Sequence, residues 1–237
     1  MSSEIFAMPE ELAALRLLWL FVFLITVLML SLCYVFLAMR RARERETESR
    51  EFSNLAIEGL ETERRRVSRE LHDTVLPLVQ DQAVSALIRS ICTELVPPDF
   101  SRLSLTDSLA DLCMQFTKRT GIDCPLSIEE NLDFSLFSPE NQLHLYRMVQ
   151  ESLTNIGKHS GARKASLVAR RFTKGSSENI LICVSDDGKG LKTKVGEGLG
   201  MRSMRQRAAI LGARLDFKSE NGNGLMVRIE LKMRNEE

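Results

Sequence analysis

The stretch "SPENQLHLYRMVQESLTNIGKHSGA", residues 138–162, predicts a long helix with one apolar face and one polar edge. Ser138 is a good N-cap, and Pro139 suits the first helical position. Glu151 and Asn155 lie one turn apart. A carboxylate and an amide oxygen at this spacing suit a hydrated magnesium ion, although this pair alone is frequent by chance. The apolar face is formed by Leu143, Tyr146, Val149, Leu153 and Ile156.

Two strands and a glycine-rich turn follow this helix. "KASLVARRF" (164–172) and "NILICVSD" (179–186) alternate as strands do. The second strand runs into "DDGKGL" (186–191). A carboxylate at a strand end, followed by glycines, lets the backbone turn tightly against a flat ligand.

A second glycine-rich segment, "GEGLGMRSMRQRAAILGA" (196–213), places three glycines just before a predicted helix. The exposed amides at the start of a helix can receive phosphate. "ARLDFKSE" (213–220) and "LMVRIELK" (225–232), joined through "NGNG" (221–224), then predict a hairpin. Each glycine motif alone also fits an ordinary turn, but their order downstream of residues 138–162 favours a nucleotide site.

The upstream stretch "RELHDTVLPLV" (69–79) places His72 beside Asp73 in a helical run, with Pro77 five residues later. An acid next to a histidine can tune it as a nucleophile. A proline is not expected inside an uninterrupted helix. The stretch is therefore either a chemical site on a kinked helix or a surface histidine in a helix that stops early.

Residues 40–76 predict one long charged helix, and a second helix ends at Pro97 and Pro98. The two would join near residues 80–82 as an antiparallel hairpin. A thin apolar stripe on the first helix, with a polar lapse at Glu63, favours a dimer seam, and the alternative is a helix lying on another domain. The segments "LTDSLADLCMQFTKRTG" (105–121) and "DCPLSIEENL" (123–132) predict a further amphipathic helix and a short strand. The stripe consists of Phe52, Leu55 or Ala56, Leu60, Val67, Leu71 and Val75.

Residues 17–39 carry no charge and predict a single transmembrane helix of about 34 Å. The run is too long for a signal peptide and is followed by cations. Arg40, Arg41, Arg43 and Arg45 stand against an acidic N-terminal tail, which places the C-terminal region in the cytoplasm. Residues 1–16 would then form a short extracytoplasmic tail of a single-pass protein in the cytoplasmic (inner) membrane.

The 32 basic and 32 acidic residues balance, so the overall charge predicts no direct nucleic-acid partner. The five cysteines are scattered, without the spacing of a zinc site.

The four ordered motifs resemble those of two-component sensor histidine kinases, in the DesK/NarX-like group. "ERRRVSRELHDTV" (63–75) is similar to that group's phosphoacceptor box, and "YRMVQESLTNIGKHSGA" (146–162) to its N box. "DDGKGL" and "GLGMRSMRQRAAILGA" (198–213) are similar to its two glycine boxes. The resemblance implies an α+β protein with a juxtamembrane signalling helix (40–60), a dimerisation and phosphoacceptor hairpin (61–100) and a GHKL-type (Bergerat) α/β sandwich ATPase domain (101–237).

The resemblance also implies roles for individual residues. His72 would be the phosphoacceptor and Asp73 its general base, while Glu151 would hold the attack geometry or a metal-bound water. Asn155 would coordinate Mg²⁺, and Asp186 would bind the adenine amino group. The remaining nucleotide-binding positions would be Lys158, His159, Gly188, Gly190, Gly198, Leu199 and Gly200.

The implied function is ATP- and Mg²⁺-dependent autophosphorylation on His72, followed by transfer to an aspartate of a response regulator. The implied partners are a second copy in a homodimer, a cytoplasmic response regulator with a helix-turn-helix output domain, and membrane lipid. One alternative is a signalling-inactive, nucleotide-binding partner of another kinase. A serine kinase of the anti-sigma type is disfavoured, because such proteins have no phosphoacceptor hairpin.

Two features depart from the family. Leu76 and Pro77 stand where the family usually has glycine and the glutamine that positions water for dephosphorylation, which leaves phosphatase activity open. Pro77 predicts a bend one turn past His72. The hairpin is also short, with about three turns expected after His72 and as many returning.

Overall fold

The computed structural model describes residues 10–175, 177–190, 198–220 and 223–233, which form two units that divide between Ser53 and Asn54. Helix α1 (Glu10–Glu70) contributes to both units. In the first unit, the 27 residues Leu15–Arg41 form a helix that is long and apolar enough to cross a membrane, by length and composition only. This segment contains the predicted span, 17–39, whereas most of the predicted tail lies outside the described residues.

In the second unit, the end of α1 and helix α2 (Gln82–Leu95) form a hairpin. Ser68 donates its hydroxyl to the Cys92 carbonyl oxygen at 3.2 Å, and the Cys92 thiol donates to the Ser68 carbonyl at 3.5 Å. The Asp81 carboxylate caps α2 by accepting from the amides of Ala83 and Val84 at 2.7 and 3.1 Å. The two helices are therefore joined at residues 79–81, as the sequence predicted.

The helix beyond His72 differs from the expectation. The α-helical pattern ends at Glu70, a π-helical turn η1 (Leu71–Val75) follows, and a 3₁₀ turn η2 (Leu76–Leu78) contains Pro77. The three helical turns predicted after His72 are therefore wrong, because the helical run ends at Leu78, whereas the bend one turn past His72 stays a prediction. The physical reason is that Leu76 donates to the Leu71 carbonyl five residues back, and Pro77 has no amide hydrogen with which to continue. The returning helix α2 has 14 residues, close to four turns.

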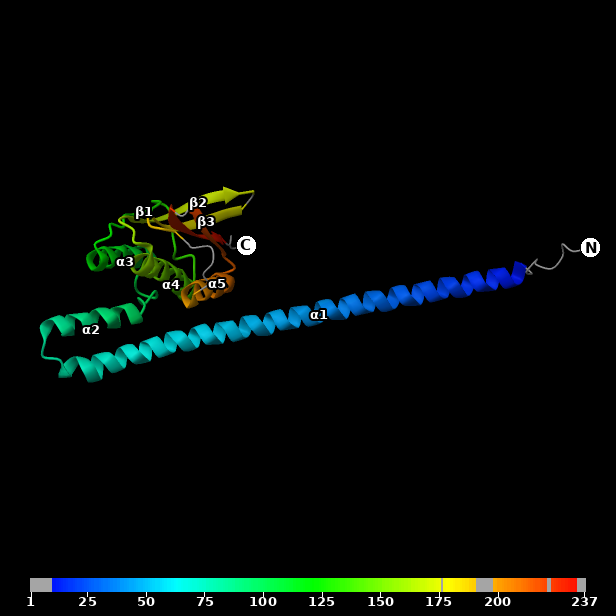
Figure 1. The fold of residues 1–237 in the computed structure, drawn as a ribbon, viewed down its shortest axis with the longest axis horizontal. Helices are drawn as coiled ribbons and strands as arrows, with labels where there is room; N and C mark the ends of the chain where they lie inside the picture. The colour runs from blue at the N-terminus through cyan, green and yellow to red at the C-terminus, as the bar shows by residue number, and fades with distance from the viewer. Residues whose placement is uncertain (1–9, 176, 191–197, 221–222, 234–237) are drawn as a thin grey trace, which may run out of the picture. The chain divides into compact units, whose positions relative to one another are not determined.

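The rest of the second unit is a two-layer α/β sandwich. Its sheet has the order β1-β2-β3-β5-β4, with β1 parallel to β2 and the other neighbours antiparallel. Helices α3, α4 and α5 cover one face of this sheet (Figure 1). The predicted N-cap Ser138 and the helix-ending Gly121, at φ 72°, lie where expected. The elements are α3 (Leu105–Thr120), β1 (Leu126–Ile128), α4 (Pro139–Asn155), the π turn η3 (Ile156–Ser160), β2 (Ala165–Lys174), β3 (Ser177–Asp186), α5 (Leu199–Leu211), β4 (Arg214–Glu220) and β5 (Asn223–Lys232).

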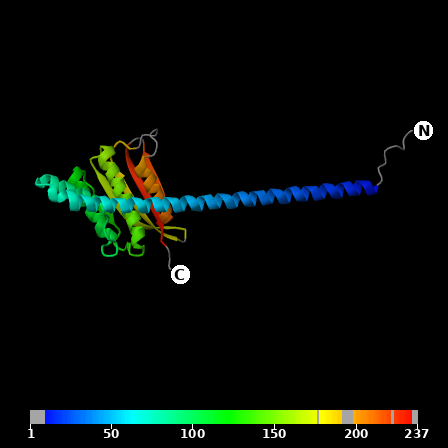
Figure 2. The same ribbon diagram turned by 90° about the horizontal axis from the view of Figure 1, so that it is seen from below.

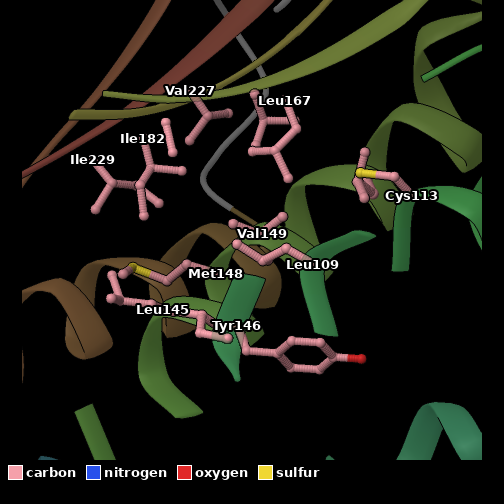
Figure 3. Packing of buried hydrophobic residues seen from close by; sticks show 14 of the residues in the cluster. Leu109, Cys113, Leu145, Tyr146, Met148, Val149, Leu167, Ile182, Val227 and Ile229 are labelled. Atoms are coloured by element: carbon pink, nitrogen blue, oxygen red, sulfur yellow. The ribbon is translucent and has the colours of Figure 1, made fainter. Parts of the chain in front are cut away.

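The hydrophobic core lies between the sheet and helices α3 and α4. Leu167, Ile182, Val227 and Ile229 point from the strands toward the helices (Figure 3). From α4, the side chains of Leu145, Met148 and Val149 meet them and are fully buried. This packing fixes the rotation of α4 about its own axis. The predicted fold class, α+β with a sandwich of the GHKL type, is confirmed.

After Ser53, toward its C-terminal end, helix α1 has a buried face that the sequence did not predict. Ile57, Glu61 and Ser68 are buried and recur at helical spacing, so they share one side of the helix. By contrast, Leu55 and Leu60 of the predicted apolar stripe are 67% and 53% exposed. In the view of Figure 2, α1 passes across α4 and α5. The stripe itself remains a predicted dimer seam.

The contact of α1 with α4 and α5 is a buried ion cluster, which we call the Glu61 cluster and which consists of Glu61, Arg147 and Arg207. One Glu61 oxygen accepts from Arg147 Nη2 at 2.6 Å and Nε at 3.1 Å, and the other accepts from Arg207 Nη2 at 2.6 Å. The three side chains are only 9%, 2% and 4% exposed. Burial opposes ionisation, yet the two guanidinium groups outweigh it and lower the pKa of Glu61.

Arg147 also joins α4 to the end of α2. It donates to the carbonyl oxygens of Glu94 and Leu95 at 3.2 and 2.8 Å. These carbonyls belong to the last turn of α2, where no intrahelical donor remains. Arg147 therefore supplies hydrogen-bond donors to the last carbonyl groups of α2 while it pairs with Glu61 on α1.

His144 borders the same cluster. Arg207 donates from Nη1 to His144 Nδ1 at 3.1 Å, which requires an unprotonated Nδ1. Burial, and then the charge of Arg207, lower the pKa of His144 from 6.5 to about 4.

We expect this histidine to make stability depend on pH. The unfolded chain takes up the proton first, so the contribution of neutral His144 is complete above about pH 6.5 and is lost as pH falls toward 4. His144→Gln keeps an acceptor but does not titrate. Denaturation of the full chain in detergent between pH 7 and 4 should give a shallower loss of stability in His144→Gln than in the wild type. Identical slopes would contradict the assignment.

Candidate functional site

Asp186 ends β3 at the centre of the predicted nucleotide site. Its Oδ1 accepts from the Gly188 amide at 2.8 Å. Burial raises the pKa of Asp186, and the amides of Gly188 and Leu225 offset part of this effect. A Cβ on Gly188 would lie 2.5 Å from the Ser160 carbonyl oxygen, so only glycine fits the turn. Gly190, at φ 67°, has a left-handed backbone that also favours glycine.

The turn after β3 is tied to the loop after α4 by backbone hydrogen bonds. The Lys189 amide donates to the Ser160 carbonyl at 3.0 Å. The amides of Arg163 and Lys164 donate to Asp187 Oδ1 at 2.8 and 2.9 Å. These two amides hold the pKa of Asp187 below its usual value. Ser160 and Asp187 thus join the N-box end to the first glycine turn, a role that the sequence reasoning missed.

Gly224 is a second residue that the sequence reasoning missed. The "NGNG" segment was interpreted only as a hairpin turn, but the Gly224 amide donates to the Gly188 carbonyl at 2.5 Å. A Cβ on Gly224 would strike the backbone carbonyl of Asp186. The role of Gly224 could have been predicted from the pairing of the strands. β5 lies beside β3 with Leu225 opposite Asp186, which places Gly224 next to the turn after Asp186.

The end of α4 and the start of α5 form the other side of the site. Helix α5 begins at Leu199 with Gly198 as its N-cap. The Glu151 carboxylate fills the space that a Cβ on Gly200 would occupy. Asn155 is the last, half-buried residue of α4, and the exposed Lys158 and His159 follow in η3. The predicted nucleotide-site residues therefore lie at the end of α4, in η3, in the turn after β3 and at the start of α5. Residues 191–197 lie outside the described residues.

A cavity of about 280 Å³ adjoins this side. From α4 it is lined by Arg147, Glu151 and Thr154, which recur at i, i+4 and i+7 and so share one face, and from η3 by Lys158. Four basic and two acidic side chains line it, which favours an anionic occupant. The charged lining residues are Arg64, Arg147, Lys158, Arg207, Glu94 and Glu151.

His72 and Asp73 lie apart from these residues, on η1. His72 Nδ1 and Asp73 Oδ1 are 3.0 Å apart, and their side chains are 65% and 73% exposed. A carboxylate oxygen only accepts, so in the neutral imidazole Nδ1 would carry the hydrogen and Nε2 would keep its lone pair. Among described elements, η1 packs against α2 and η2. The structure therefore presents an accessible histidine with a free ring nitrogen, but does not bring it to Asp186.

Comparison with known proteins identifies the domain that contains this site. Residues 140–235 match the family described as histidine kinase-, DNA gyrase B- and HSP90-like ATPase. The predicted resemblance to sensor histidine kinases with such a domain is confirmed. The match covers α4, β2, β3, α5, β4 and β5, the elements that carry Asp186 and the glycine turns.

Sensor histidine kinases are also found among the relatives. Sensor histidine kinase LnrJ of Bacillus subtilis is 28% identical over 73% of this chain and 48% of its own length. Sensor histidine kinase MctS of Rhizobium johnstonii is 31% identical over 71% of this chain and 43% of its own length. The chain thus spans about half the length of these relatives. The histidine kinase domain of the Erythrobacter litoralis EL346 blue-light activated histidine kinase shares the fold, with a TM-score of 0.52 at 18% identity over 73% of this chain and 83% of that one.

We expect Gly200→Ala to weaken nucleotide binding. The new methyl group would occupy the space of the Glu151 carboxylate, and this side chain would have to swing away from α5, so we expect a loss of affinity of roughly fivefold or less, which is about 1 kcal/mol. Titration of the full chain with a fluorescent ATP analogue measures the change. Gly59→Ala is the matched control, because nothing lies within 4 Å of a Cβ at that helical position. Equal affinity in the two variants would contradict the close contact between Glu151 and Gly200.

Proposed function

We propose that this chain is a membrane-bound sensor histidine kinase that phosphorylates His72 from ATP and passes the phosphoryl group to an aspartate of a response regulator. The observation that carries the proposal is the exposed His72–Asp73 pair, 3.0 Å apart, in the same chain as an ATPase domain. The pair would have little use in a protein that only bound nucleotide, since neither side chain supports the fold.

The described residues fit ATP. The half-buried Asp186 carboxylate would accept a hydrogen bond from the adenine amino group. The turn at Gly188 is too tight for a side chain and so leaves the backbone open to a flat base. The start of α5 at Gly198 offers amides and a positive helix end to phosphate. Lys158 and His159, exposed in η3, would lie near the phosphates.

Asn155 would supply an oxygen ligand to Mg²⁺, with Glu151 holding a metal-bound water. No group of three or more acidic, histidine or cysteine side chains in the described residues could hold a metal by itself. Phosphate oxygens and water would complete the coordination, as is usual for Mg²⁺. When bound, the ion would neutralise charge on the phosphates.

The chemistry at His72 follows from its tautomer. Nδ1 donates to Asp73, so Nε2 would attack the γ-phosphorus while the bond to the bridging oxygen of ADP breaks. The imidazole gains positive charge as the N–P bond forms. The Asp73 carboxylate, held at Nδ1, would stabilise that charge and take the Nδ1 proton.

The remaining parts of the chain would supply the membrane anchor and the dimer. Residues 17–39 would cross the membrane once, with the arginines that follow on the cytoplasmic side and near lipid. Exposed apolar side chains on both hairpin helices, including Leu55, Leu60, Leu87 and Ile91, would pack against a second copy. The same hairpin would present His72 to the response regulator.

Labelling separates this function from that of a signalling-inactive nucleotide-binding partner. The full chain, incubated in detergent with Mg²⁺ and ATP labelled at the γ-phosphate, should acquire acid-labile, base-stable label. His72→Gln should bind ATP but acquire none, because glutamine has no nucleophilic ring nitrogen. ATP binding without any label in the wild type would favour the inactive partner.

Asp73→Asn should slow autophosphorylation on the order of 100-fold or more, which is the usual contribution of a general base. An amide can still orient the ring but cannot take the Nδ1 proton. ATP affinity should stay unchanged, because Asp73 is exposed on η1 and away from Asp186. The initial rate of labelling and the affinity for a fluorescent ATP analogue test the two statements. A wild-type rate would remove Asp73 from the mechanism.

A further inference from the structure

The carboxylate of Asp186 is held by backbone amides from two different segments. Its Oδ1 accepts from the Gly188 amide at 2.8 Å. The amide of Leu225, which lies opposite Asp186 in the pairing of β3 with β5, makes a backbone hydrogen bond to the same carboxylate. The turn after β3 and the start of β5 therefore fix its direction together, and the remaining lone pairs of the carboxylate are left for a ligand.

The peptide unit between Gly224 and Leu225 is itself held in place from β4. Its carbonyl oxygen, which belongs to Gly224, accepts from the Ser219 hydroxyl at 2.8 Å. A peptide unit is planar, so a hydrogen bond that fixes the carbonyl also fixes the direction of the Leu225 N–H. Hydrogen bonds in such a chain polarise one another, which strengthens the donation to Asp186. Ser219 therefore acts on the Asp186 carboxylate through this peptide unit.

Gly224 approaches the turn after β3 closely. Its amide donates to the Gly188 carbonyl at 2.5 Å, and its backbone is left-handed, at φ 68°. A Cβ at this position would strike the Asp186 carbonyl oxygen. Gly224 is also buried, so the neighbouring backbone would have to give way to the added atom. A side chain at this position would therefore push the start of β5 away from Asp186.

We propose that Ser219, Gly224 and the Leu225 amide are positioning residues that determine which nucleobase the site accepts. They hold the Asp186 carboxylate in the direction in which it accepts from the exocyclic amino group of adenine. This inference rests on the proposed function, in which Asp186 binds that group. It goes further because it assigns the selectivity for the base to β4 and β5, outside the two glycine-rich motifs.

The difference between the two purines explains how direction becomes selectivity. Adenine carries an amino group, which is a donor, where guanine carries a carbonyl oxygen, which is an acceptor. A carboxylate held in one direction accepts from adenine and repels guanine. A carboxylate that can turn aside loses the hydrogen bond to adenine and also escapes the repulsion. The ratio of the affinities for ATP and GTP therefore reports the direction of the Asp186 carboxylate, whereas either affinity alone also reports the shape of the pocket.

Gly224→Ala tests the close approach, and Gly175→Ala is its matched control. Gly175 has nearly the same backbone, at φ 64°, in the turn between β2 and β3, but nothing lies within 4 Å of a Cβ there. Both variants add the same backbone strain, and only Gly224→Ala displaces Asp186. The full chain in detergent is titrated with ATP and GTP analogues that are fluorescently labelled on the ribose. Gly224→Ala should lower the ratio of affinities for ATP over GTP about tenfold or more, the worth of one hydrogen bond to a charged group. Gly175→Ala should keep the wild-type ratio.

Ser219 provides a second test that leaves the glycine backbone unchanged. Ser219→Ala removes the hydroxyl and should lower the same ratio roughly two- to tenfold, the range for one uncharged hydrogen bond. Ser219→Thr keeps a hydroxyl and should restore the wild-type ratio. Ser135→Ala is the control, because the Ser135 hydroxyl donates to Asp133 in an exposed turn. If Gly224→Ala does not fold, Ser219→Ala decides the inference.

The outcomes separate this inference from the proposed function. An equal loss of both affinities in Gly224→Ala and Ser219→Ala, with an unchanged ratio, would indicate a merely structural role and overturns the inference. An equal fall of the ratio in Gly175→Ala overturns it as well, because backbone strain alone would then suffice. A wild type that binds both nucleotides equally also overturns it. If the wild type prefers ATP but acquires no label, the kinase function fails, and the ratios still decide the inference.

Discussion

The burial of α4 against the sheet is the constraint on which the rest of the structure depends. Leu145, Met148 and Val149 are fully buried, so α4 cannot rotate without exposing the core. With that face fixed, helical geometry assigns the others. Arg147 must face the hairpin, and Glu151 must face the start of α5. Core packing, domain contact and nucleotide site are thus set by one helix, and a change in its rotation would affect all three.

The Glu61 cluster and the hydrophobic core stabilise the molecule in different ways. Apolar side chains between the sheet and α4 gain free energy from leaving water, roughly in proportion to the area buried. Glu61 and its two arginines gain little on balance, because desolvation offsets their attraction. What the cluster adds is position, since three charged groups with directional hydrogen bonds meet in one arrangement only. The ATPase domain is therefore folded by its apolar core, whereas the Glu61 cluster determines how that domain lies on the hairpin.

The features that the sequence predicted are those with local causes. Ser138 caps α4 because its hydroxyl reaches an amide three residues on, and Gly121 ends α3 because it adopts a left-handed backbone. The glycine turns around Asp186 were found because their spacing and order resemble a known family. Glu61, Gly224 and Ser160 were missed because their roles depend on residues far along the chain. The length of the helix after His72 was misjudged for a related reason, because the π turn at Leu71 has no sequence signature.

The length of the hairpin and the position of the ATPase domain on α1 depend on each other. Ser68 pairs with Cys92, so α2 has only three more residues before its last turn ends at Leu95. Arg147 donates hydrogen bonds both to the carbonyl oxygens of that last turn and to the Glu61 carboxylate. A second helix one turn longer would carry its end about 5.4 Å further along α1, and Arg147 could no longer satisfy both. Hairpin length therefore selects which turn of α1 the ATPase domain contacts. In this chain that turn is upstream of His72, so the distance between the predicted nucleotide site and His72 is set by where α2 stops.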